Sequence, residues 1–217
     1  MRKTVHFLGL LAFILMFGYV PSANSALPAS PHVNPCAKSP RAEVLCAFEN
    51  YAKTVQYVVI TLNTGLGQSV VKYAFPEDSA SVRTTELSRP GNVLESIFIG
   101  NKAWTLIDGY DPSLVHWSKK TPIGNITMEA RHSMFAKVLA LKHSTSPFID
   151  KGSIVFQNHR LRRFSFFDHG RPILVDIDLA KNLPVRYITS GGVYIYSDFN
   201  KKIVIKAPST FGHPAIY

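Results

Sequence analysis

Cysteine is scarce in this chain of 217 residues, which contains only Cys36 and Cys46. Their separation matches neither the paired spacing of a zinc site nor the CxxC motif of redox proteins. In an oxidising compartment we expect them to form a disulfide that ties the N-terminal segment to the first helix. Two free thiols are the alternative.

Catalytic signatures are also missing from the sequence. It has no GxSxG elbow, no HExxH motif, no P-loop and no glycine-rich dinucleotide fingerprint. His132 beside Arg131, or His169 beside Asp168, could take part in acid–base chemistry. A solvated surface is the simpler interpretation of both pairs. We therefore predict a binding protein that is not an enzyme, with no catalytic residue, cofactor or metal.

Acidic residues are few, 14 against 24 basic ones. This balance favours acidic partners such as anionic lipid headgroups and peripheral contact with a membrane, although it could also serve solubility alone. The sharpest basic cluster is "NHRLRRF", and its Arg160, Arg162 and Arg163 could clamp a phosphate or another anionic headgroup. The alternative is a solvated strand face beside a turn. The predicted export of the protein is evidence against a nucleic-acid partner.

No apolar run is long enough for a bilayer-spanning helix. The longest, Phe7 to Val20, has about 14 residues, whereas a span takes about 20. It follows Arg2 and Lys3 and precedes "PSANSA", which is the layout of a secretory signal peptide. We predict a signal peptide over 1–25, an extended leader over 26–39, and one domain over 40–217. Without Arg2 and Lys3, 22 basic residues remain against 14 acidic ones, a net charge of +8.

The sequence is rich in short β-type segments separated by turn residues. They predict an antiparallel meander with strands over 57–62, 68–75, 80–87, 93–99, 102–107, 153–157, 160–167, 173–179, 185–189, 193–199 and 203–206. Helices are predicted in "SPRAEVLCAFENYAKTV" and "TMEARHSMFAKVLALKHS". In the second, Ala130, Met134, Val138 and Leu141 form an apolar stripe that Phe135 and Leu139 widen.

Two helices are a small cover for about 11 strands. The predicted fold class is therefore mainly β (α+β), a strongly curved antiparallel sheet that forms an incomplete barrel with the helices across its open side. The last hairpin, "GGVYIYSDFNKKIVIKAPS", is bulky on both faces. We expect Val193, Ile195 and Phe199 to point inward, and Tyr194 and Tyr196 to point outward.

Several segments of the sequence, taken in their order along the chain, resemble the LolA-like family of periplasmic lipoprotein carriers and lipid-binding proteins. They are "VVKYAFPEDS", "IFIGNKAWTLIDGYDP", "RHSMFAKVLAL" and "IVIKAP". The family implies a half-barrel whose apolar cavity shields acyl chains, with a helical lid. It also implies a role in outer-membrane biogenesis. The sequence departs from the family pattern at Phe75, before Pro76, where the carriers have an arginine that helps to latch the lid.

The resemblance implies a monomeric, periplasmic carrier or binding protein for a lipid or an acylated lipoprotein. Its partners would be an inner-membrane releasing complex or an outer-membrane acceptor. A partner-binding or envelope-stress module of the same fold is the alternative. Each predicted lining residue could instead fill a solid core. The predicted lining comprises Val71, Tyr73, Phe75, Phe98, Trp104, Leu106, Met134, Phe135, Val138, Phe164, Phe166, Val175, Ile177, Tyr187 and Ile195.

Overall fold

The computed structural model describes residues 39–107, 116–120 and 124–208. These residues form two helices, α2 (Pro40–Thr54) and α3 (Ile126–His143), and a single antiparallel sheet. The strands are β1 (Tyr57–Thr64), β2 (Gly67–Ala74), β3 (Ser79–Glu86), β4 (Arg89–Ile99), β5 (Lys102–Ile107), β6 (His116–Lys120), β7 (Ile149–Phe156), β8 (His159–Asp168), β9 (Arg171–Asp178), β10 (Leu183–Thr189) and β11 (Gly192–Ser197).

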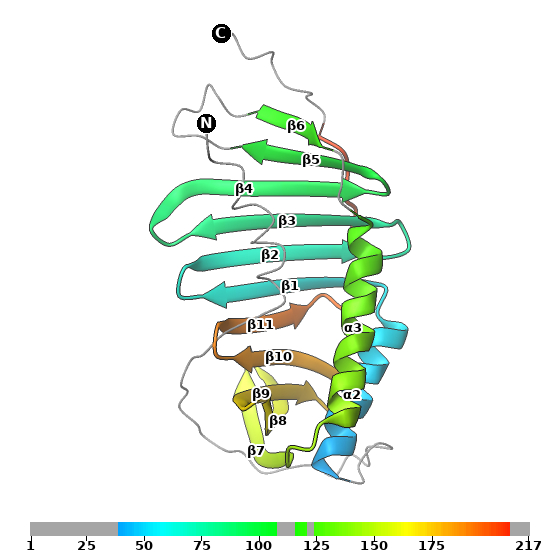
Figure 1. Cartoon of the computed structure of the whole chain (residues 1–217), viewed down its shortest axis with the longest axis vertical. Helices are drawn as coiled ribbons and strands as arrows, with labels where there is room; N and C mark the ends of the chain where they lie inside the picture. Colours follow the sequence, from blue (N-terminus) through cyan, green and yellow to red (C-terminus); the bar gives the residue numbers. More distant parts are fainter. Residues whose placement is uncertain (1–38, 108–115, 121–123, 209–217) are drawn as a thin grey trace.

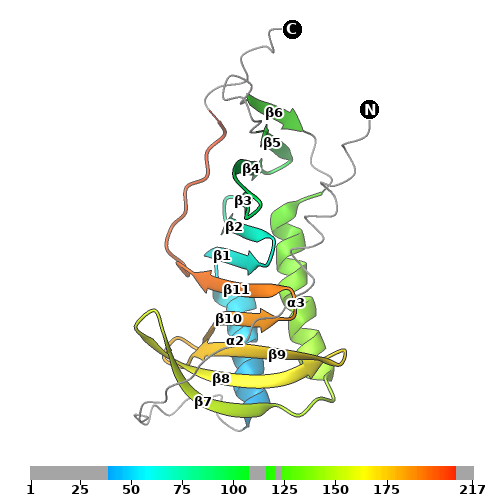
Figure 2. The same ribbon diagram turned by 90° about the vertical axis from the view of Figure 1, so that its left-hand side faces the viewer.

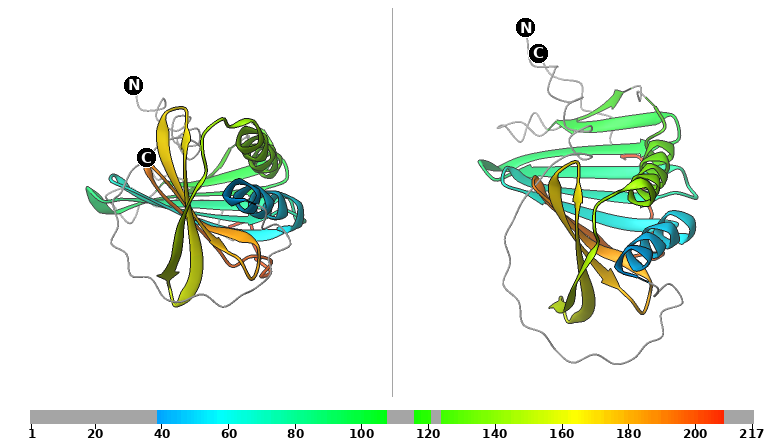
Figure 3. Two further views of the ribbon diagram at one scale, coloured as in Figure 1. Left: turned by 90° about the horizontal axis from the view of Figure 1, so that it is seen from below. Right: turned by 60° about the horizontal axis from the view of Figure 1, so that its bottom comes forward.

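The sheet is open, with the strand order β6-β5-β4-β3-β2-β1-β11-β10-β9-β8-β7. The pairing of β1 with β11 joins an N-terminal meander, β1–β6, to a C-terminal meander, β7–β11. Seen from below, β7–β9 cross the direction of β2–β4, so the sheet twists strongly along its length (Figure 3). The prediction of a mainly β, antiparallel α+β fold with two helices is therefore confirmed.

Both helices run along the long axis of the sheet, near one end of its strands (Figures 1 and 2). They are antiparallel to each other and in mutual contact. Among the described residues, neither helix combines the length and apolar content that a membrane-spanning segment needs.

The helix predictions are confirmed in position. Ser39 caps α2 by accepting a hydrogen bond from the Ala42 amide at 3.1 Å, and Pro40 occupies the first turn. Asn125 caps α3 in the same way through the Met128 amide at 2.9 Å. The buried stripe of α3 is narrower than predicted, because Phe135 and Leu139, which were expected to widen it, are 46% and 54% exposed.

One predicted strand is absent and one observed strand was not predicted. Residues 203–206 are not a strand, because β11 is already paired on both sides, with β1 and with β10. No sheet edge remains there for a closing hairpin. The strand that was not predicted is β6, the last of the N-terminal meander, which pairs with β5.

The facing of β11 is the reverse of the prediction. Tyr194 lies opposite Leu62 of β1, and Tyr196 lies opposite Ile60, on the face that carries the core. Both tyrosines are buried, and the ring of Tyr196 meets that of Tyr51 on α2 edge-on, with centroids 5.4 Å apart. Ile195 therefore lies on the opposite face of the sheet, since successive side chains alternate. Phe199, beyond the strand, does pack against the core, as predicted.

The core fills the space between α2 and the C-terminal half of the sheet. Val44, Phe48 and Tyr51 lie on one face of α2 and are nearly inaccessible to solvent. Phe48 meets Tyr187 of β10 edge-on, with ring centroids 6.0 Å apart. Beneath α2, these side chains therefore pack against the sheet as part of the core.

Candidate ligand-binding site

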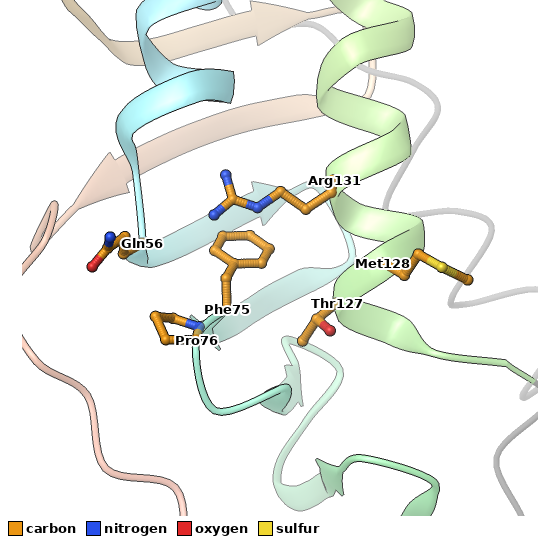
Figure 4. Close-up of a pocket in the computed structure, with 6 residues that line it drawn as sticks. All are labelled: Gln56, Phe75, Pro76, Thr127, Met128 and Arg131. Carbon is orange, nitrogen blue, oxygen red and sulfur yellow. The ribbon is translucent and has the colours of Figure 1, made fainter.

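A pocket of about 400 Å³ opens where α3 begins, beside the end of β2 and the link between α2 and β1. Figure 4 shows Phe75 and Pro76 at its base, with Arg131 of α3 above the Phe75 ring. Gln56 and Met128 lie on opposite sides of this pair. The residues lining the pocket are Gln56, Phe75, Pro76, Thr127, Met128 and Arg131.

Arg131 fastens α3 to both other layers of the fold. Its guanidinium lies over the Phe75 ring, 3.9 Å from the centroid, and its Nη1 donates to the carbonyl of Ala52 at 3.0 Å. Burial lowers the pKa of Arg131, and the nearby Tyr51 partly opposes that shift. A stacked guanidinium that also donates a hydrogen bond holds α3, α2 and the end of β2 together.

A second fastening lies at the first turn of α3. Asp78, in the turn between β2 and β3, accepts hydrogen bonds from Asn125 Nδ2 at 2.8 Å and from the Thr127 hydroxyl. Asp78 has a positive φ of 45°, a conformation that short polar residues tolerate best. The start of α3 is therefore tied to a turn of the sheet by polar contacts.

The aromatic floor of the pocket continues into the interior. Phe75 stacks on Tyr73, with ring centroids 5.3 Å apart and planes 5° from parallel. Burial raises the pKa of Tyr73 to about 12, and it also raises the pKa of Tyr196. These phenols are neutral at ordinary pH, so the path inward from Phe75 is aromatic and uncharged.

Lys137 lies farther along α3, and its ammonium is turned toward the sheet. Its Nζ is 3.4 Å from the centroid of the Tyr187 ring and 5.9 Å from that of Phe48. Burial lowers its pKa to about 8, while the charge of Asp168 acts in the opposite direction. None of the ion pairs among the described residues includes Lys137.

The structure divides the predicted lining into three groups. The largest group lies on the core face and is packed. Its members are Val71, Tyr73, Phe75, Met134, Val138, Phe164, Phe166, Val175, Ile177 and Tyr187. Phe98 shares this face but is half-buried, between Ala80 of β3 and Ala103 of β5.

The remaining predicted lining residues do not reach the interior beneath the helices. Trp104, Leu106 and Ile195 lie on the opposite face of the sheet from Phe98. Phe135 is on the exposed side of α3. Of the predicted lining, Phe75 alone lines the pocket of Figure 4.

The three arginines of the predicted headgroup clamp are not brought together. Arg160 is exposed, and Arg162 pairs with Asp150. Arg163 lies on the opposite face and donates to both oxygens of Asp176, at 2.7 and 3.0 Å. Asp176 is fully buried, and Arg186 also donates to it at 2.7 Å.

Some predictions lie partly or wholly outside the described residues. The signal peptide, the leader and Cys36 do so, and the disulfide of Cys36 with Cys46 of α2 stays a prediction. Within the described ranges, no group of three His, Cys, Asp or Glu side chains is placed to hold a metal ion.

Sequence reasoning missed Gln56, Asp78, Arg131 and Lys137 as site residues. Arg131 was discussed only as a neighbour of His132, yet its spacing offered a signal. Arg131 lies three residues before Met134, on the inward side of the predicted helix. A charged side chain on an apolar stripe is a candidate for a specific contact.

Comparisons with known proteins assign no family to the chain. No family model matches it, and no curated protein matches it. Among solved structures it is similar to an uncharacterized conserved protein from Thermus thermophilus, with 8% sequence identity and a TM-score of 0.37. That similarity covers 72% of this chain and 86% of the other.

Proposed function

We propose that this protein is an exported, periplasmic binding or carrier protein for a lipid or acylated ligand, with α3 as a movable lid. The observation that carries the proposal is the pocket at the start of α3. There, an arginine fastens the helix over an aromatic floor that leads into the interior. Its volume of about 400 Å³ lies within the range of small-molecule sites, about 300–1,000 Å³.

The way α3 is attached supports its role as a lid. Besides Val138 and Leu141, which are buried, α3 is held by polar contacts at its margins. One of them joins Lys142 to Glu49 of α2 at 2.7 Å. A partly exposed ion pair of this kind contributes little to stability, and segments with few buried apolar contacts open first. Movement of α3 would uncover apolar surface while the packing under α2 stays intact.

Apolar burial alone would supply the affinity. Each methylene removed from water contributes about 0.8 kcal/mol, so a single acyl chain needs no catalytic group or metal to be retained. The proposed latch differs from the one that the LolA-like resemblance implies. Here Phe75 stands on the sheet, and Arg131 comes to it from the lid. Lipoprotein traffic, the releasing complex and the outer-membrane acceptor remain parts of this proposal.

Two measurements on the mature protein test the proposal. Organic extraction followed by mass spectrometry should recover an acylated molecule, and a fluorescent fatty acid should titrate with saturation. The matched variant is Met128→Asp, which places a charge at the wall of the pocket on a side chain that is 52% exposed. We expect weaker binding at unchanged stability. If no lipid is recovered and the wild type shows no saturable binding, the proposal is wrong.

A partner-binding module is the second candidate, and the outer side of α3 favours it. Met128, Phe135 and Leu139 are each about half exposed, at spacings that place them on one side of the helix. Exposed apolar rows of this kind mark interaction sites. Phe135→Asp together with Leu139→Asp should abolish capture of a membrane regulator from envelope extracts while lipid binding persists. Loss of lipid binding alone would favour the carrier.

A further inference from the structure

Lys137 is a cation that forms no ion pair with any of the described residues. The side chain is half-buried, and its ammonium lies against the face of Tyr187 at 3.4 Å, with Phe48 of α2 farther away. Tyr187 in turn meets Tyr194 of β11, with ring centroids 6.3 Å apart. The ammonium therefore lies over neutral aromatic rings from two elements, β10 and α2, and a third ring, from β11, packs against Tyr187.

The charged group that acts on Lys137 from the sheet is Asp168, at the end of β8. Its carboxylate is about half exposed and is bonded to His169, with Oδ1 and Nδ1 2.8 Å apart. The influence of Asp168 is smaller than that of burial, because the net effect is a lowered pKa of Lys137. Burial raises the pKa of both Tyr187 and Tyr194, so neither phenol supplies a negative charge at neutral pH.

In this arrangement the half-buried ammonium of Lys137 lacks, within the described part of the chain, an anionic partner that would offset its loss of hydration. An aromatic face returns only part of the free energy that an unpaired cation loses when it is taken out of water. An anion that carries an apolar chain would pair with the ammonium and bury that chain against the apolar surface that movement of α3 uncovers. Because the side chain is only half-buried, such a group can reach it.

We propose that Lys137 binds the anionic headgroup of a single-chain amphiphile, a free fatty acid carboxylate, whose chain lies on the apolar surface that movement of α3 uncovers beside Tyr187. This inference rests on the proposed lipid-binding function and names its ligand class. One ammonium matches one carboxylate in charge. The nearest arginine on the inward side of α3 is Arg131, and its guanidinium is engaged with Phe75 and Ala52. A lipid whose acyl chains are all esterified or amide-linked would place no carboxylate beside Lys137.

Competition binding on the mature protein separates the headgroup from the chain. Displacement of a fluorescent fatty acid is measured with oleate, oleyl alcohol and lysophosphatidic acid on the wild type, Lys137→Met and Lys72→Met. Lys72 is an exposed residue of β2, so its variant loses the same charge outside the site. We expect the wild type and Lys72→Met to bind oleate at least about 10-fold more tightly than oleyl alcohol, equivalent to about 1.4 kcal/mol. Lys137→Met should lose that preference and still bind the alcohol.

Each outcome has a distinct meaning. If the alcohol binds saturably and the wild type shows no preference for oleate, the headgroup inference is wrong and the proposed function stands. The same holds if Lys137→Met keeps the preference. Tighter binding of lysophosphatidic acid than of oleate would contradict the fatty acid and assign the site to a phosphate. If none of the three ligands displaces the probe, the proposed function itself fails. Circular dichroism on Lys137→Met confirms that a lost preference reflects the site and not the fold.

Discussion

At the scale of single residues, this protein places charges in positions that its strand pattern does not reveal. Asp176 alternates with apolar neighbours on β9 as a surface residue would, yet it is fully buried between two arginines. On the same face of the sheet, Arg186 lies over the ring of Phe156 of β7, 3.9 Å from the centroid. The buried carboxylate is therefore structural.

Removal of that carboxylate should be costly. In Asp176→Ala, Arg163 and Arg186 lose their common partner, and breaking a buried ion pair from one side costs about 3–5 kcal/mol. Urea unfolding followed by circular dichroism measures the change. The control is Glu86→Ala, an exposed residue of β3, for which we expect about 0.5 kcal/mol or less. Equal midpoints for the two variants would contradict the structural role of Asp176.

Lys137 makes the stability of the ligand-free protein depend on pH. Its pKa is about 8 in the folded state and about 10.4 when unfolded, so the unfolded chain binds more protons between these values. The free energy of unfolding should therefore rise with pH from about 8 upward. The rise is opposed above about pH 10, where the raised pKa values of the buried tyrosines act in the other direction.

Thermal unfolding at pH 7.5 and pH 9.5 measures this effect. The melting temperature of the wild type should increase relative to that of Lys137→Met over this interval. Lys72→Met should follow the wild type, because its ammonium is exposed. Parallel curves for the wild type and Lys137→Met would show that Lys137 titrates normally.

At the scale of elements, the two helices differ in how they are held. Core residues of α2 such as Val44 and Phe48 are buried against the sheet. The inner stripe of α3 is narrower, and its ends rely on Asp78, Arg131 and Lys142. The sequence pattern predicts both helices equally well, because periodicity shows where a helix forms and not how deeply it is buried.

This difference predicts local opening of α3. In Arg131→Ala the helix loses a hydrogen bond from a charged donor, which contributes about 1.5–3 kcal/mol, and also its stacking on Phe75. Amide hydrogen exchange in α3 should accelerate about 10-fold or more, with α2 unchanged. His132→Ala, at the exposed next position, serves as the control. Equal acceleration in both helices would indicate global destabilisation and would contradict the role of α3 as a separate lid.

At the scale of the whole molecule, the sheet depends on one pairing between segments far apart in sequence. β1 and β11 join the two meanders, and Gly192 at the start of β11 lies tight against β1. A Cβ at Gly192 would lie 2.3 Å from the carbonyl oxygen of Asn63. Only a residue without a Cβ fits this close approach of two backbones.

Gly192→Ala should therefore weaken the junction of the two meanders. We expect a loss of about 1–3 kcal/mol in the free energy of unfolding, as for other overpacked sites, measured by urea unfolding. Gly65→Ala is the matched control, since nothing lies within 4 Å of its added Cβ. That variant should leave the stability equal or raise it by about 0.4–1 kcal/mol. If both variants behave alike, close packing at Gly192 is not what joins the sheet.

Local signals in the sequence were sufficient for most of the strands, both helices and the antiparallel class. Turn residues, caps and alternation act within a few residues of each other, and they report those elements directly. The same signals placed Phe75 at the end of a strand and α3 after the first meander. They could not pair Phe75 with Arg131, because that contact joins segments far apart in the chain.

Only the tertiary structure decided which side of each strand faces inward and which charges meet. In β11 both faces carry bulky apolar side chains. Alternation therefore shows which side chains share a face, but it does not show which face points toward the core. Contact with Tyr51 of α2 turned Tyr196 inward. Because β1 and β10 occupy both edges of β11, residues 203–206 have no free edge of β11 with which to pair. The amino-acid sequence alone determined the elements and their order, since those depend on near neighbours. Long-range packing determined the facing of the tyrosines, the burial of Asp176 and the place of Lys137.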